Sequence, residues 1–149
     1  MDSFTVTVQF DPKTGKVYAP DDIKPQGINF STCYFTIANA HMSSTVPGAV
    51  KVNGTGNCPS TKEPYQLEAT MVLESCFGSP CSAYKTGSSS RKTVGAAGQK
   101  WFNQDLNAFA TCIPGHYRGR LKFAAYGIDG VAVAYPFYDA VGNTTFVGC

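Results

Sequence analysis

A row of basic side chains along residues 116–122 is the clearest chemical signal in this sequence. The basic residues, each two positions from the next, are His116, Arg118, Arg120 and Lys122. In a β-strand this spacing puts them all on one face, because successive side chains point to opposite sides. Cations in a row attract anionic ligands such as an acidic glycan, a cell-wall polymer or an acidic protein. We therefore predict a candidate binding face at Arg118, Arg120 and Lys122.

The charge distribution supports this candidate but also offers a structural alternative. The formal net charge is +2, yet residues 85–122 contain seven basic residues and one acidic residue. The predicted strand 65–76 carries Glu68 and Glu74 on its polar face. Opposite charges on neighbouring antiparallel strands stabilise a sheet by about 0.2–1 kcal/mol per pair. The cations at 118–122 therefore either bind a ligand or pair with Glu68 and Glu74.

The same region suggests a catalytic alternative. His116 with the nearby arginines and with Glu68 or Glu74 could supply a base, an acid and a cation for phosphodiester cleavage, as in a small secreted nuclease-like hydrolase. Such an enzyme requires His116 to lie within hydrogen-bond reach of one of these glutamates. The sequence has no G-x-S-x-G elbow and only one other histidine, His41. We expect a non-enzymatic protein without a metal or another cofactor.

Six cysteines indicate disulfides rather than a zinc site, because no C-x-x-C pair occurs. They are Cys33, Cys58, Cys76, Cys81, Cys112 and Cys149. Disulfides form in oxidising compartments, so we expect a secreted, extracellular protein. A mature chain with an added Met1 would explain why residues 1–3 do not begin a signal peptide. A cytosolic protein with free thiols remains the alternative.

The disulfide pairing is open, since six cysteines allow 15 combinations. Cys76 and Cys81 fit a bridge across a hairpin. By position alone we expect Cys58 to pair with Cys112, and Cys33 with Cys149. A loop closed by this disulfide would present Phe77 rigidly to solvent. A protease inhibitor or a subunit of a secreted complex requires such a rigid, exposed side chain. The alternative is an ordinary hairpin tip.

Aromatic residues form a further candidate site. An aromatic ring offers a sugar both apolar area and a polarised face. The residues are Trp101, Tyr126, Tyr135, Phe137 and Tyr138. Pro136 favours an edge strand, which would leave the neighbouring rings accessible. Packing in the core or at one end of the domain is the alternative.

The elements that must position these residues are β-strands, because the dominant hydrophobic period is two. The predicted strands span 4–10, 17–18, 28–38, 49–53, 65–76, 81–86, 102–112, 117–126, 131–138 and 144–147. Helical spacing competes only at 102–112. Residues 82–98, rich in Ser and Gly, are expected to form a mobile hairpin tip or loop. We predict one all-β domain, an antiparallel immunoglobulin-like β-sandwich, with an N-terminal hairpin and linker at 1–27 and the sandwich body at 28–149.

The corner at 112–117 carries the immunoglobulin-like prediction. Pro114-Gly115 would turn the chain, and Tyr117 would be the tyrosine that closes such a corner. Position 119 is Gly, where antibody domains have Cys. The segments 53–58, 76–81 and 111–118 resemble small secreted, disulfide-linked immunoglobulin-like proteins of bacteria. That resemblance implies a fold and secretion, but no activity.

Composition narrows the function further. Hydrophobic residues make up 43% of the chain and charged residues 15%, which is typical of a globular domain. No apolar run approaches the length of a membrane-spanning helix, and we expect no specific binding of nucleic acid. The resulting prediction is a secreted binding module for an extracellular protein or an anionic glycan.

Overall fold

The computed structural model describes residues 3–11, 16–18, 22–27, 30–60, 65–77, 80–94, 106–126 and 139–149. Eleven β-strands and no helix occur in these ranges, and so the described chain contains no helix able to cross a membrane. The strands are β1 (Ser3–Phe10), β2 (Val17–Tyr18), β3 (Ser31–Ala38), β4 (His41–Met42), β5 (Ala49–Ser60), β6 (Tyr65–Ser75), β7 (Ser82–Val94), β8 (Leu106–Thr111), β9 (Gly115–Tyr126), β10 (Asp139–Val141) and β11 (Thr145–Val147).

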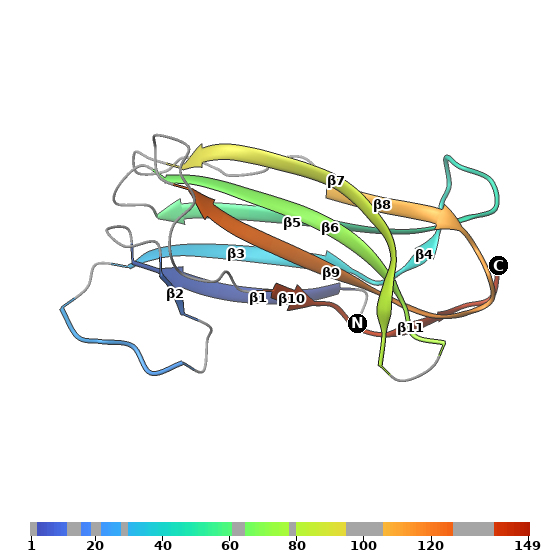
Figure 1. Cartoon of the computed structure of the whole chain (residues 1–149), viewed down its shortest axis with the longest axis horizontal. Coiled ribbons are helices and arrows are strands. Elements are labelled where there is room, and N and C mark those ends of the chain that lie inside the picture. The colour runs from blue at the N-terminus through green and yellow to red at the C-terminus, as the bar shows by residue number, and fades with distance from the viewer. Residues whose placement is uncertain are drawn as a thin grey trace.

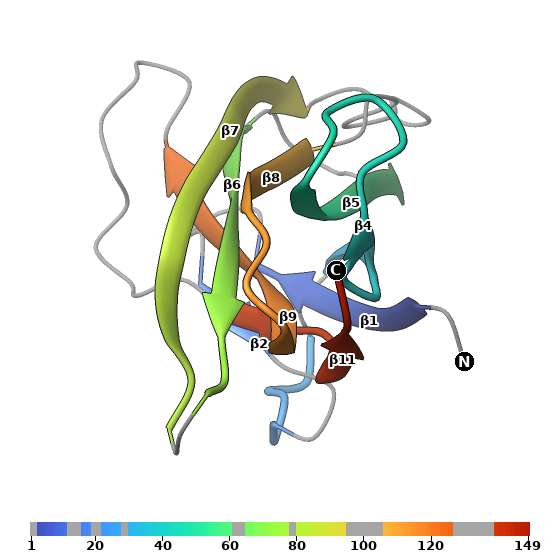
Figure 2. The same ribbon diagram turned by 90° about the vertical axis from the view of Figure 1, so that its right-hand side faces the viewer.

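Two antiparallel sheets face each other (Figures 1 and 2). Sheet A has the order β2-β1-β3-β5-β4, and β8 also pairs with β5. Sheet B has the order β10-β9-β6-β7, and β11 also pairs with β9. Strand β1 pairs with β3 over its full length, so the N-terminal hairpin belongs to sheet A. The prediction of an all-β fold is confirmed.

The core lies between the sheets and follows the period-two pattern of the sequence. Ala69, Met71 and Leu73 of β6 are fully buried, as their spacing predicts. They pack with inward side chains of the other central strands, which are Cys33, Phe35, Ile37, Val50, Val52, Tyr117 and Leu121. Alternation puts every second side chain of these strands on an outer face, where a binding site must lie.

Glycines let the two sheets approach closely. A Cβ at Gly119 of β9 would lie 2.6 Å from Val52 Cγ2 and 2.8 Å from Ile37 Cγ2, both in sheet A. A Cβ at Gly54 of β5 would lie 2.6 Å from Met71 Cε in sheet B. The space that a side chain at position 119 would need is therefore filled by side chains from the opposite sheet.

The predictions for segments 82–98, 102–112 and 131–138 had different outcomes. The predicted strand 81–86 is confirmed, but the loop predicted for 82–98 is wrong over 87–94, because β7 pairs with β6 from Ser82 to Val94. Its glycine content has a packing reason: a Cβ at Gly87 would lie 2.1 Å from the Asn107 carbonyl oxygen of β8. The ambiguous segment 102–112 contains a strand, β8. The predicted strand 131–138 lies outside the described residues.

The disulfides confirm one predicted pairing and correct two. Cys76 is bonded to Cys81, as expected. Cys112 is bonded to Cys149, so the expected pairs Cys58–Cys112 and Cys33–Cys149 are wrong. The reason is the register of β11, which sets Val147 opposite Gly115 and brings the C-terminal end beside the 112–114 corner. Cys33 of β3 is disulfide-bonded as well.

Candidate functional site

The predicted basic face lies on the outer surface of sheet B and is largely neutralised there. Glu74 of β6 is directly opposite Arg118 of β9. The Nε of Arg118 donates to Oε1 of Glu74 at 2.7 Å, and the Nε of Arg120 donates to Oε2 at 2.9 Å. Arg120 also reaches Asp139 of β10 at 3.3 Å. One carboxylate thus holds two guanidinium groups.

The charge state of Glu74 follows from these contacts. Only 5% of the residue is exposed. Burial alone would raise the pKa of Glu74, but the hydrogen bonds from Arg118 and Arg120 outweigh it and hold the pKa below the ordinary value. The hydrogen bond to Glu74 likewise raises the pKa of Arg120. Glu74 and Arg120 are therefore ionised at neutral pH.

The structural alternative accounts for Arg118 and Arg120. Lys122 remains exposed, next to Asp139 in the strand pairing. The other predicted partner, Glu68, lies opposite Ala124, farther along β9. The predicted binding face therefore offers one cation to solvent, and its two guanidinium groups are already held by carboxylates.

The catalytic combination is not assembled around His116. The ring of His116 packs edge-on against Phe146 of β11, with 5.3 Å between the centroids. In the part of the chain that the structure describes, no hydrogen bond joins His116 to Glu74. Glu68 pairs with Ala124, which lies eight residues beyond His116 in β9. At the rise of a strand, His116 and Ala124 are roughly 26 Å apart. The described residues also contain no cluster of three His, Cys, Asp or Glu side chains able to hold a metal ion.

Tyr117 closes the corner before β9, as the sequence predicts for this residue. Its ring is fully buried. The hydroxyl donates to the Ile113 carbonyl oxygen at 2.6 Å and accepts from the Ile113 N–H at 3.1 Å. These two bonds fix the segment 112–114, which carries the exposed Ile113 side chain.

Phe77 is half-exposed but does not project from the hairpin tip. Its ring packs edge-on against Tyr117, with 5.4 Å between the centroids. It also covers Gly115, where a Cβ would lie 2.1 Å from Phe77 Cε1. Phe77 therefore lies back over the end of the core, unlike the anchor residue of a protruding inhibitor loop.

The side chains of the predicted aromatic site for a sugar are not among those that the structure describes. Trp101, Tyr135, Phe137 and Tyr138 lie outside the described residues. Tyr126 ends β9, in a part of the strand whose side chains are not described.

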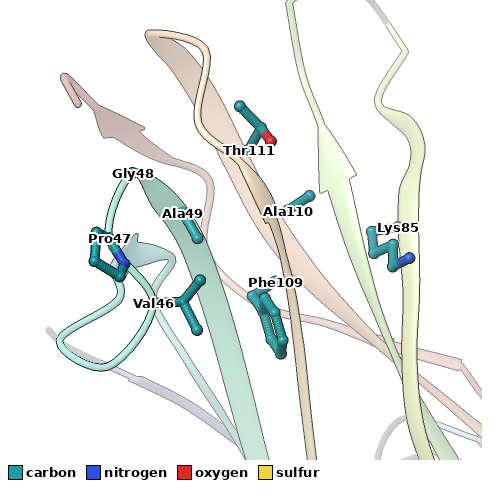
Figure 3. A pocket seen from close by; sticks show the side chains of 8 residues that line it. All are labelled: Val46, Pro47, Gly48, Ala49, Lys85, Phe109, Ala110 and Thr111. Carbon is teal, nitrogen blue, oxygen red and sulfur yellow. The ribbon is translucent and has the colours of Figure 1, made fainter.

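A groove that the sequence analysis missed lies on the outer surface of sheet A (Figure 3). Its volume is about 450 Å³. The turn between β4 and β5 forms one wall, β8 forms the floor, and β7 supplies one residue. The lining residues are Val46, Pro47, Gly48, Ala49, Lys85, Phe109, Ala110 and Thr111. Strand spacing contained a signal for it: if Leu106 and Ala108 face the core, Phe109 must face outward.

The β4–β5 turn, β11 and the C-terminus lie at one end of the sandwich (Figure 2). The groove and both described disulfides lie at this end, which we call the disulfide end. It comprises the β4–β5 turn, the β6–β7 hairpin tip, the end of β8 with the 112–114 corner, and β11 with Cys149. Five large apolar side chains are exposed there. They are Met42 (38%), Phe77 (52%), Phe109 (43%), Ile113 (51%) and Phe146 (60%).

Comparison of the chain with protein-family models, with curated proteins and with solved structures gives no match. Function therefore has to be inferred from the side chains themselves.

Proposed function

We propose that this protein is a secreted, immunoglobulin-like module that binds a partner protein with its disulfide end. The exposed apolar residues at that end carry the proposal. Exposed apolar side chains are common singly, but several at one end of a domain, one of which (Phe109) lines a groove, are typical of interaction sites. Two disulfides close to these side chains limit their motion, which lowers the entropic cost of binding.

The strand order supports an immunoglobulin-like fold. In that fold strand E pairs with B in one sheet, while C, F and G form the other sheet, with C′ beside C in variable-type domains. Taking β5 as B and β6 as C, β8 pairs with β5 as E would, and β9, β10 and β7 take the places of F, G and C′. The Tyr117 hydroxyl bonds at the start of β9 match a tyrosine corner at E–F.

Secretion is supported by the cysteines. No free cysteine occurs among the described residues, and disulfides persist mainly in oxidising compartments. Extracellular immunoglobulin-like domains act mostly through their surfaces, and this agrees with a binding role.

A protein partner fits this end better than an anionic glycan does. When a glycan binds, hydrogen bonds from the protein must replace those from the water around its hydroxyl groups. Thr111 and Lys85 supply the only polar side chains among the described lining residues of the groove. The guanidinium groups of Arg118 and Arg120, which suit carboxylate and sulfate, are held by Glu74. Apolar side chains of a partner protein match Val46, Pro47 and Phe109 directly.

The test is selection of random dodecapeptides displayed on phage against the immobilised, oxidised protein. Ile113→Asp puts a charge in the middle of the disulfide end while leaving the backbone bonds to Tyr117 intact. Ile23→Asp is the matched control, because Ile23 is 95% exposed and lies between β2 and β3. We expect enriched peptides to lose at least about tenfold in affinity for Ile113→Asp and to bind Ile23→Asp unchanged. No enrichment, or equal binding to both variants, would overturn the proposal.

A further inference from the structure

Phe109 lies between lysines that come from two different sheets. Lys51 of β5 is directly opposite Phe109 of β8, and His41 of β4 is directly opposite Lys51. Directly paired residues share a face of the sheet, so these three side chains form a row across three strands. Lys85 of β7 lines the groove on the other side of Phe109 (Figure 3).

Within the described ranges, the lysines around Phe109 have no acidic partner. Among the described residues no carboxylate pairs with Lys51 or Lys85, in contrast to the arginines of β9. The described residues that line the groove include no acidic side chain. An aromatic ring between two ammonium groups is therefore complementary to a ligand that combines apolar and acidic groups.

Backbone and side-chain bonds hold the walls of the groove. The Ser43 hydroxyl accepts from the N–H of Thr45 and of Val46, which fixes the β4–β5 turn. The Cys112 N–H donates to the Gly48 carbonyl at 2.9 Å, and the Tyr84 hydroxyl donates to the Thr111 carbonyl at 2.8 Å. The turn, β8 and β7 are thereby tied together, so the groove exists before a ligand arrives.

We propose that this groove receives an acidic segment of the partner protein. An apolar side chain of that segment lies on Phe109 beside Val46 and Pro47, and neighbouring Asp or Glu carboxylates approach the ammonium groups of Lys51 and Lys85. This inference rests on the proposed function and adds the chemistry of the partner to it. A peptide fits better than an acidic polysaccharide because half-exposed Phe109 and the turn residues require apolar side chains.

The experiment uses the peptides selected above, synthesised in two versions, with Asp and Glu or with Asn and Gln. Binding of both versions is measured by calorimetry at low and high salt, for the wild-type protein and for the double variant Lys51→Glu/Lys85→Glu. Lys122→Glu is the matched control, because Lys122 is an exposed lysine on sheet B. Polygalacturonate is tested in parallel as an acidic glycan.

We expect the acidic peptide to bind at least about tenfold more tightly than its amide version, and to lose this advantage at high salt and in the double variant. Lys122→Glu should bind like the wild type. Peptides that bind the disulfide end but do not depend on acidic residues or on these lysines would overturn this inference and leave the proposed function intact. Binding of polygalacturonate that depends on Lys51 and Lys85, without peptide binding, would overturn both. The amide peptides keep the test decisive even if the double variant does not fold.

Discussion

Glu74 shows how one residue can cancel a binding face. It is the buried charged side chain among the described residues, and it lies in the outer face of sheet B between Arg118 and Arg120. A carboxylate at this place is tolerated because both oxygens accept hydrogen bonds from charged donors. The carboxylate in turn orders the arginine side chains, so the arginines stabilise the sheet.

This arrangement predicts an acid-sensitive contribution to stability. Glu74 has a pKa below its ordinary value of 4.5, so the unfolded state binds a proton more readily than the folded state. Its contribution is therefore fully present above about pH 4.5 and is lost as the pH falls through the folded-state pKa. Glu74→Gln should cost about 1–3 kcal/mol at pH 7 and progressively less below pH 4.5, as measured by urea unfolding at several pH values.

Asp139→Asn is the control for this prediction. Asp139 is 40% exposed and makes a single contact of 3.3 Å with Arg120, so its loss should cost less than about 1 kcal/mol at any pH. Equal, pH-independent costs for the two variants would show that Glu74 contributes through packing alone.

Tyr117 carries the corner on which Ile113 is exposed. Tyr117→Phe should cost about 1–2 kcal/mol, because two hydrogen bonds to the Ile113 backbone are lost in a buried place. Tyr84→Phe removes a single bond to the Thr111 carbonyl near the surface and should cost less. Thermal unfolding of both variants measures the difference, and a larger loss for Tyr84→Phe would contradict this assignment.

At the scale of elements, the alternating sequence of β9 gives the strand one face in the core and one face that forms ion pairs. Its inward residues Tyr117 and Leu121 fill the core, and its outward arginines bind Glu74. Gly119 sits between the inward residues, where Val52 and Ile37 of sheet A leave no room for a side chain. Strand β9 is therefore held both by packing across the sandwich and by ion pairs within its own sheet.

Gly119→Ala should accordingly destabilise the fold by about 1–3 kcal/mol, because its Cβ would force apart side chains of a packed core. Gly148→Ala is the matched control: its Cβ would meet only Phe146, at 3.4 Å. Urea unfolding of the two variants compares the costs. A neutral effect of Gly119→Ala would mean that the sheets separate easily at this point.

At the scale of the whole molecule, the disulfides Cys76–Cys81 and Cys112–Cys149 both lie at the end that we propose as the binding surface. Cys112–Cys149 spans 37 positions of the sequence and ties β11 to the corner before β9. Cys76–Cys81 spans five positions and closes a hairpin tip. A long closed loop restricts the unfolded chain more than a short one does.

Removing the two bridges should therefore have unequal effects. Replacing Cys112 and Cys149 by Ala should cost about 4 kcal/mol, and replacing Cys76 and Cys81 by Ala about 2 kcal/mol. Guanidinium chloride unfolding of the two double variants measures this. Equal losses would show that chain entropy is not the dominant contribution of these bridges.

The sequence by itself determined most of the strands and their core face, because side-chain alternation is a local property. Ala69, Met71 and Leu73 could be assigned to the core from spacing alone, and so could the role of Tyr117 at the corner. Composition misled at 87–94, where Ser and Gly indicated a loop, since strand pairing with β6 depends on another segment of the chain.

Only the tertiary structure decided which charges are paired and which cysteines meet. Glu74 and Arg118 are 44 residues apart, and the register between β6 and β9 makes them neighbours. The groove at Phe109 brings together β7, β8 and the β4–β5 turn, none of which signals the others in the sequence. Contacts between segments distant in the chain depend on strand order and register. Neither of these can be predicted from the side-chain spacing within one segment.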